Sequence, residues 1–318
     1  MLKITNIPPA HIQAELEELK ADLIKSIPSK SEENILIATW NIRAFGKLTS
    51  KWEAIGKDSP KRDIQSLLNI IQIIKSFDII AVQEVKSNIK CLRDTIHMLG
   101  SDWSFIMTDV TKGNAGNGER LAFIFNTKRA KLSGLACEIV IPKEQLDNNI
   151  QPNALDKQFA RTPYAVGFKV KNKTFILLTL HVLFGGSVKE RAPELKAIAE
   201  WMYDWAKQLK KWNQSLIILG DFNIARKGDA AYDAFLSKNL YIPEELQKFP
   251  RTVFKKLKLY DQIGWYKNSR SKSQINLTYK SGGIYDFRNF TLQSRNYTPS
   301  KLSYRISDHF PLWIEFGI

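Results

Sequence analysis

The stretch Leu216-Ile-Ile-Leu-Gly-Asp-Phe-Asn223 is an apolar run of strand length that ends in a carboxylate and a carboxamide. Consecutive branched aliphatic residues of this kind are typical of a strand buried on both faces. Asp221 and Asn223 therefore stand at the end of a predicted core strand. Taken alone, an Asp or Asn after a strand is most often a turn or cap residue, so this stretch needs others like it.

Polar side chains border other apolar runs in the same way. They follow the runs 35–40, 78–83 and 175–180, and they precede the run 310–316. The residues are Asn41, Glu84, His181, Asp308 and His309. If these strand ends converge, one site holds hard oxygen ligands and two imidazoles. Such oxygens suit Mg²⁺, with Mn²⁺ as an alternative, and a metal there can polarise a phosphoryl oxygen.

The chain of 318 residues is predicted to have an N-terminal helical extension with a linker (residues 1–33) and one main domain (residues 34–318). Apolar residues at positions 12, 16, 19, 23 and 27 repeat at helical spacing, so residues 9–27 are predicted as a helix. Pro28 suits the end of that helix. Its apolar stripe either packs on the main domain or contacts another chain.

The main domain is rich in predicted strands and has few helices. Helical periodicity covers residues 64–75 and 190–210, and glycine-rich stretches at 112–118, 185–186 and 281–283 are predicted as turns. The predicted strands are residues 35–40, 78–83, 103–107, 120–126, 164–170, 174–181, 216–221 and 312–316. Because strands and helices do not alternate strictly, packed sheets with outer helices are favoured over a barrel or a doubly wound sheet.

The chain is strongly basic, with a formal net charge of +15. Residues 248–305 are the most skewed, with 13 Lys or Arg against only Asp261 and Asp286, and tyrosines and a tryptophan are interleaved. Such a surface attracts polyanions without regard to sequence, and nucleic acid is the expected partner. A merely solubilising charge excess and a lipid headgroup partner remain alternatives.

Two cysteines, Cys91 and Cys137, make neither a disulfide framework nor a zinc motif. The first residues lack the apolar core of a secretion signal, and no apolar run approaches the length of a membrane span. These features predict a cytoplasmic protein with structural thiols.

Four motifs stand at these strand ends: Trp40-Asn-Ile-Arg-Ala-Phe-Gly46, Ile80-Ala-Val-Gln-Glu-Val-Lys86, Gly220-Asp-Phe-Asn223 and Ile306-Ser-Asp-His-Phe-Pro311. Together they resemble the endonuclease/exonuclease/phosphatase superfamily, and within it deoxyribonuclease I. Segments around Glu119-Arg120, Phe159-Ala-Arg-Thr-Pro-Tyr164 and Tyr285-Asp286 strengthen the likeness, which runs from residue 35 to the end.

The resemblance implies an α/β (α+β) fold: a four-layer sandwich of two mixed sheets packed face to face, with helices on the outer faces. It also implies roles for the site residues. The metal ligands would be Glu84, Asn41, Asp308 and Asp221, with Mg²⁺ as the cofactor; the calcium sites of the family do not transfer to particular residues. The catalytic set would be His181 with Glu119, His309 with Asp286, Asp221 and Asn223. Arg43, Arg161 and Lys86 would bind phosphate or nucleic acid.

Two positions depart from the family pattern. The loop 113–118 has no aromatic residue to stack on a sugar in the DNA minor groove, and Lys86 replaces an arginine, so charge is kept but forked hydrogen bonding is lost. The helix 9–27 and the basic stretch 265–280 have no counterpart in the family.

The expected function is a Mg²⁺-dependent endonuclease that hydrolyses phosphodiester bonds in double-stranded DNA with low sequence specificity. The resemblance implies 5′-phosphate and 3′-hydroxyl ends. A phosphatase or phosphodiesterase of the same fold, acting on another phosphate ester, is the alternative, since fold does not fix substrate. A non-catalytic nucleic-acid-binding protein is a third possibility. A protein partner or self-association would involve the N-terminal helix.

Overall fold

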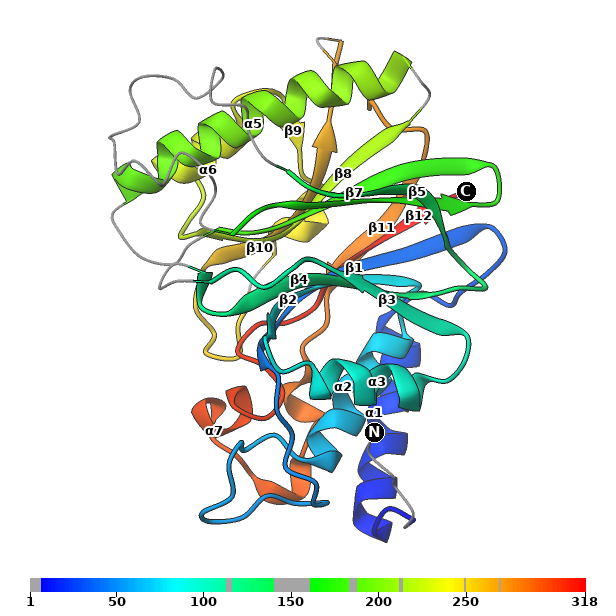
Figure 1. Cartoon of the computed structure of the whole chain (residues 1–318), viewed down its shortest axis with the longest axis vertical. Helices are drawn as coiled ribbons and strands as arrows, with labels where there is room; N and C mark the ends of the chain where they lie inside the picture. Colours follow the sequence, from blue (N-terminus) through cyan, green and yellow to red (C-terminus); the bar gives the residue numbers. More distant parts are fainter. Residues whose placement is uncertain are drawn as a thin grey trace.

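The computed structural model describes residues 7–112, 116–139, 161–182, 188–211, 214–248, 250–268 and 270–318. Within these ranges two sheets of six strands each pack face to face, and helices cover both outer faces (Figure 1). The predicted four-layer sandwich is therefore confirmed.

The first sheet has the strand order β11-β12-β1-β2-β4-β3. Its strands are β11 (Thr278–Ile284), β12 (Leu312–Gly317), β1 (Asn34–Phe45), β2 (Ile79–Lys86), β4 (Glu119–Asn126) and β3 (Trp103–Met107). Three helices cover its outer face: α1 (Ala10–Ser26), α2 (Ile64–Lys75) and α3 (Lys90–Leu99) (Figure 1). Strand β1 alternates between the two cores, because Ile35 and Ile37 face the other sheet while Leu36 and Ala38 face the helices.

The second sheet has the order β5-β6-β7-β8-β10-β9. Its strands are β5 (Lys131–Glu138), β6 (Tyr164–Val170), β7 (Lys173–His181), β8 (Ser215–Ile224), β10 (Leu259–Tyr266) and β9 (Leu240–Tyr241). Helices α5 (Val188–Lys211) and α6 (Ala230–Leu236) lie over it (Figure 1). The β1–β2 and β7–β8 pairs are parallel, so the strand ends that carry the predicted site residues share an edge.

The prediction of a turn at the glycine-rich stretch 281–283 is wrong. This stretch belongs to β11, an edge strand that pairs with β12. A Cβ at Gly282 would lie 2.8 Å from the Leu246 side chain, and one at Gly283 would lie 3.2 Å from the Trp313 ring. These glycines therefore allow a close approach of side chains to the strand, which is a known use of glycine within sheets. Residues 185–186 lie outside the described ranges.

The apolar stripe of the N-terminal segment forms α1 and packs against α2, with Leu19 and Leu23 in the same apolar core as β1 and β2. Polar contacts add to the docking, since the buried carboxylate of Glu15 accepts hydrogen bonds from Gln65 Nε2 over 2.8 Å and from the Ser294 amide over 2.7 Å. Association of α1 with a further chain stays a prediction.

Cys91 and Cys137 are both free thiols. Among the described helices, none combines the length and the apolar character needed to cross a lipid bilayer.

Candidate active site

Three polar side chains lie in register at one edge of the second sheet. His181 of β7 pairs with Asp221 of β8, and Asp221 pairs with Asp261 of β10. All three are buried, and Nε2 of His181 lies 3.7 Å from Oδ2 of Asp221. The parallel β7–β8 pair brings two strand ends to the same place, which is why these residues meet although they are distant in sequence.

His309 approaches Asp221 from the segment that leads into β12 of the other sheet. Its Nε2 lies 3.8 Å from the same Oδ2 of Asp221 that His181 faces. Its Nδ1–H donates to Oδ2 of Asp261 over 2.8 Å. The ring of Tyr260 stacks on the imidazole, with 5.7 Å between the ring centroids. Both histidines thus present Nε2 to a single carboxylate oxygen.

The carboxylate partner of His309 is Asp261, so the predicted pairing of His309 with Asp286 is wrong. Asp286 forms an ion pair with Arg288 instead, and its side chain is 38% exposed. The dipeptide Tyr-Asp occurs at Tyr260-Asp261 as well as at Tyr285-Asp286. Of these two, only the first lies within a strand of the second sheet, beside Asp221. The local sequence carried no signal for it, because Asp261 and Gln262 interrupt the apolar pattern of residues 259–266.

Glu119 holds the other imidazole. Its Oε2 lies 3.3 Å from Nδ1 of His181 and 3.0 Å from Nε of Arg161. Its Oε1 accepts hydrogen bonds from Lys86 Nζ over 2.7 Å and from Asn117 Nδ2 over 2.6 Å. Burial would raise the pKa of this carboxyl, but His181, Lys86 and Arg161 outweigh burial and lower it to about 2. Glu119 is therefore a stable negative charge that can orient His181.

The electrostatics at His309 favour its protonated form. Burial alone would lower the pKa of this imidazole, but the charges of Asp261 and Asp221, together with the hydrogen bond to Asp261, raise it well above its ordinary value. An imidazole held between two carboxylates has a fixed orientation and a proton to donate.

The carboxylate of Asp221 is held by hydrogen bonds to both of its oxygens. Its Oδ2 accepts a hydrogen bond from Asn41 Nδ2 over 3.0 Å. Its Oδ1 accepts one from the main-chain N–H of Asn223, also over 3.0 Å. Asn223 in turn donates from Nδ2 to the Val182 carbonyl over 2.6 Å. Asn223 thus links the end of β8 to Val182, the residue that follows β7.

The glycine before Asp221 is required by the backbone. Gly220 has a φ of 145°, and a Cβ there would lie 2.1 Å from the Leu180 carbonyl oxygen of the neighbouring strand. No side chain fits that space, so only glycine can occupy position 220, directly before the Asp221 carboxylate.

Two of the predicted metal ligands, Glu84 and Asn41, lie on strands β2 and β1 of the first sheet. Glu84 has a φ of 61° and its Oε2 accepts a hydrogen bond from the Ala44 amide over 2.8 Å. Oδ1 of Asn41 is buried and has no hydrogen-bond partner among the described residues. A buried carbonyl oxygen left without a donor calls for a ligand, and carboxylate and amide oxygens are the donors Mg²⁺ prefers. Glu84 and Asn41 therefore fit a divalent metal.

A second group of ligand atoms is also close enough to hold an ion. Asp221, Asp261 and His309 each offer one ligand atom, and these atoms lie within 4.8 Å of one another. In this group, however, the imidazole already donates from Nδ1 to Asp261. The oxygen donors at Glu84 and Asn41 are therefore the better match to Mg²⁺.

Two arginines border the site. Arg43 stacks on the Tyr304 ring at 3.9 Å, donates to Ser303 Oγ over 2.8 Å, and lies 3.7 Å from the Asp308 carboxylate. Nη1 of Arg161 is buried and finds no hydrogen-bond acceptor within the part of the chain that is described. A buried guanidinium donor of this kind suits a phosphate oxygen. The Lys86 ammonium is instead occupied by its ion pair with Glu119.

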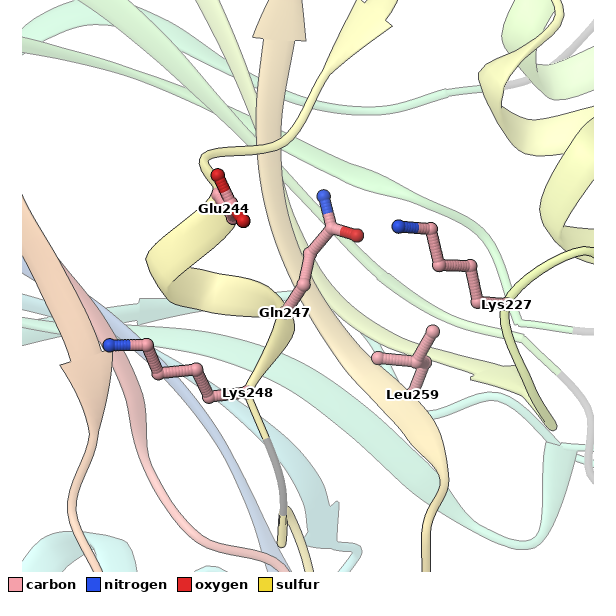
Figure 2. Close-up of a pocket in the computed structure, with 5 residues that line it drawn as sticks. All are labelled: Lys227, Glu244, Gln247, Lys248 and Leu259. Carbon is pink, nitrogen blue, oxygen red and sulfur yellow. The ribbon is translucent and has the colours of Figure 1, made fainter.

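A separate hollow of about 240 Å³ lies near the start of β10. It is lined by Leu259, by Lys227, and by Glu244, Gln247 and Lys248 at the short 3₁₀ helix η2 (Glu244–Gln247) (Figure 2). None of the predicted site residues lines it. The histidine site is therefore distinct from this hollow.

Solved structures share the fold of the chain. The human Nocturnin catalytic domain has a TM-score of 0.58 at 18% identity, covering 89% of this chain and 94% of that domain. The mannosyl-6-phosphatase Bt3783 of Bacteroides thetaiotaomicron VPI-5482 has a TM-score of 0.58 at 20% identity, over 89% of this chain and 99% of that protein. An endonuclease/exonuclease/phosphatase family protein from Bacteroides thetaiotaomicron has a TM-score of 0.55 at 20% identity, over 90% and 98%. The chain has the fold of this superfamily, as the resemblance drawn from its motifs implies.

A curated relative carries a more specific name. A protein named deoxyribonuclease, from Thioalkalivibrio sp. (strain K90mix), is 28% identical over 208 residues, which are 64% of this chain and 50% of that protein. The chain thus spans about half the length of this relative. No protein-family model matches the chain.

Proposed function

We propose that the chain is a metal-dependent endonuclease that hydrolyses phosphodiester bonds in DNA with little sequence preference. The observation that carries the proposal is the arrangement of two imidazole–carboxylate pairs around one oxygen. His181 and His309 place Nε2 3.7 Å and 3.8 Å from Oδ2 of Asp221, and each has its own carboxylate partner on the far side of the ring. Phosphodiester hydrolysis needs an acid and a base on opposite sides of the phosphorus, and two such pairs can supply them.

The roles follow from the charges. His309, held protonated by Asp261 and Asp221, is suited to give a proton to the leaving oxygen, while Asp221 is placed to accept or orient a water molecule. Arg161 offers its buried Nη1–H to a phosphate oxygen. A Mg²⁺ ion held by Glu84 and Asn41, with Asp308 nearby, would neutralise charge that develops on the phosphoryl group.

The surface next to the site supports a polyanionic substrate. The segment 252–258 is attached to the catalytic residues, since Thr252 pairs with His309 and the Val253 amide donates to the Asp308 carbonyl over 3.1 Å. Within this segment the side chains of Phe254, Lys255, Lys256 and Leu257 are exposed. An aromatic ring among lysines suits a nucleic-acid strand, because the ring can contact sugar or base while the lysines contact phosphates.

The test is incubation of supercoiled plasmid with the purified chain and Mg²⁺. We expect nicked and then linear DNA, and we expect EDTA to stop the reaction. A DNA ligase should reseal the first nicks, because it joins only 5′-phosphate to 3′-hydroxyl ends. His309→Ala should abolish nicking.

Other outcomes separate the alternatives. Intact plasmid together with rapid release of phosphate from a sugar phosphate would replace the nuclease with a phosphatase. Tight DNA binding with no hydrolysis of plasmid or of the sugar phosphate, in Mg²⁺ and in Mn²⁺, would indicate a non-catalytic nucleic-acid-binding protein. Location in the cytoplasm stays a prediction from the sequence.

A further inference from the structure

Arg62 is a buried arginine whose side chain is bonded to main-chain oxygens. It is 2% exposed. Its Nε donates to the Arg305 carbonyl over 2.8 Å and its Nη1 to the Ala44 carbonyl over 3.0 Å. Its Nη2 donates to the carbonyls of Arg43 and Ile306 over 2.6 Å and 3.0 Å. One guanidinium therefore joins two segments from opposite ends of the chain, residues 43–44 and residues 305–306.

The first of these segments orients the predicted metal ligand Glu84. The Arg43 carbonyl and the Ala44 N–H belong to the same peptide group. Arg62 binds the carbonyl of that group, and Glu84 Oε2 accepts a hydrogen bond from its N–H over 2.8 Å. Ala44 has a φ of 46° and Glu84 a φ of 61°, both in the left-handed region that non-glycine residues rarely adopt. Arg62 thus stabilises the uncommon backbone conformation at Ala44, whose N–H orients the Glu84 carboxylate.

The second segment leads into the catalytic histidine. Ile306 is followed by Ser307, whose Oγ donates to the Asn41 carbonyl over 2.6 Å and accepts a hydrogen bond from the His309 amide over 3.1 Å. Asp308 lies between them. Fixing the Ile306 carbonyl therefore fixes the start of the turn that carries Asp308 and His309 to the site.

The main chain of Arg62 is itself anchored. Its carbonyl accepts a hydrogen bond from the Thr49 amide over 2.9 Å. The next residue, Asp63, is the N-cap of α2 and accepts hydrogen bonds from the amides of Ser66 and Ala54 over 2.9 Å and 2.8 Å. The Arg62 side chain thus extends from a hydrogen-bonded residue directly before the N-cap of α2.

We propose that Arg62 is a positioning residue that sets the metal-binding side of the site relative to His309. The inference rests on the proposed function of this site. Its physical basis is the planar guanidinium, which presents several N–H groups in fixed directions and so can hold four carbonyl oxygens on two segments at once. A lysine carries the same charge, but its single ammonium cannot reach all four. Arg62→Lys therefore separates the geometry from the charge.

The experiment compares Arg62→Lys with Arg129→Lys. Arg129 is a matched control because it also bonds main-chain carbonyls, those of Ser31 and Asn34 over 2.7 Å and 2.6 Å, but at the opposite end of β1. For Arg62→Lys we expect kcat for plasmid nicking to fall by about 10- to 100-fold, with a smaller change in KM, as when a residue that orients metal ligands is replaced. Arg129→Lys should cut at the wild-type rate.

A second readout does not depend on cutting. Mn²⁺ binding, followed by electron paramagnetic resonance of the free ion, should weaken by about 10-fold or more in Arg62→Lys and stay unchanged in Arg129→Lys. If the wild-type chain binds Mn²⁺ but cuts no DNA, the proposed function fails while the Mn²⁺ affinities still test Arg62. Equal kcat and equal Mn²⁺ affinity in the folded Lys variant would overturn the inference. So would loss of folding in both Arg62→Lys and Arg62→Gln, because Arg62 would then be needed for the fold itself.

Discussion

His181 and His309 face the same oxygen of Asp221, but they are held by different surroundings. Glu119, behind His181, is compensated by Lys86 and Arg161. Asp261, behind His309, is wholly buried. Its Oδ2 accepts the hydrogen bond from His309 Nδ1, and its Oδ1 has no hydrogen-bond partner among the described residues. The imidazole of His309, held between Asp261 and Asp221, has a raised pKa and is therefore suited to donate a proton.

Replacing the carboxylate behind His309 tests that assignment. Asp261→Asn keeps the shape of the side chain but removes the charge that holds His309 protonated. We expect kcat for plasmid nicking to fall by about 10²- to 10⁴-fold, the usual effect of an acid–base group, with little change in DNA binding. Asp286→Asn is the matched control, since Asp286 pairs with Arg288 away from the histidines. An equal decrease of kcat in both variants would contradict the pairing of His309 with Asp261.

Glu119 makes stability depend on acid pH. Its pKa in the folded state is about 2, below the ordinary value of 4.5, so the folded state holds the ionised carboxyl more firmly than the unfolded chain does. The resulting stabilisation is complete above pH 4.5 and is lost as the pH falls toward 2. The difference in free energy of unfolding between the wild type and Glu119→Gln should therefore shrink from about pH 6 to about pH 3, measured by urea unfolding. A constant difference would show that His181, Lys86 and Arg161 do not hold this carboxylate ionised.

Among the elements, the strands with long aliphatic runs were the clearest to predict from the sequence. β1, β2, β7 and β8 are buried on both faces, so their composition alone distinguishes them. β10 was missed because Asp261 and Gln262 interrupt its apolar pattern, and β11 was missed because two glycines resemble a turn. In both cases the deviation has a cause in tertiary structure: the hydrogen bond of Asp261 to His309 in β10, and close packing against Leu246 and Trp313 in β11.

The same reasoning explains why the site was only partly predictable. Asn41 and His181 follow clear apolar runs, and both contact Asp221, so their meeting follows from the direction of their strands. Asp261 and Arg62 act from within a strand and from a loop, and their partners are distant in sequence. Nothing in local pattern distinguishes them from ordinary buried polar residues.

Helix α1 is expected to stabilise the fold without taking part in the chemistry. Glu15 is buried and bonded to Gln65 and Ser294, so Glu15→Ala leaves two donors without partners. We expect it to lower the free energy of unfolding by about 1–3 kcal/mol, measured with urea, while kcat is unchanged. Glu17→Ala is the control, because the Glu17 side chain is 71% exposed and forms a surface ion pair with Lys20 over 3.3 Å. A large decrease of kcat in Glu15→Ala would instead link α1 to the active site.

For the whole molecule, the positive charge is expected to govern how the chain meets the proposed DNA substrate. The net charge of +15 acts at a distance on any polyanion, but only lysines that touch phosphates release counterions. The segment 252–258 is the part of the basic surface that is fixed to the catalytic residues, through the pairing of Thr252 with His309. Lysines in that segment should therefore contribute more to DNA binding than equally exposed lysines elsewhere.

The salt dependence of DNA binding measures that contribution. Binding to a double-stranded oligonucleotide in EDTA should weaken steeply with salt, and Lys255→Ala with Lys256→Ala should reduce the slope of log K against log salt by about 0.9 for each phosphate that these lysines neutralise in the wild type. Lys128→Ala with Lys131→Ala is the matched control, since these exposed lysines flank the turn from β4 to β5, at the opposite end of β4 from Glu119. Its slope should equal that of the wild type, because a distant lysine contributes to the long-range field but displaces no counterion from DNA. The same reduction in both double variants would mean that DNA binds without a preferred surface. An unchanged slope in Lys255→Ala with Lys256→Ala would place the bound strand away from the segment 252–258.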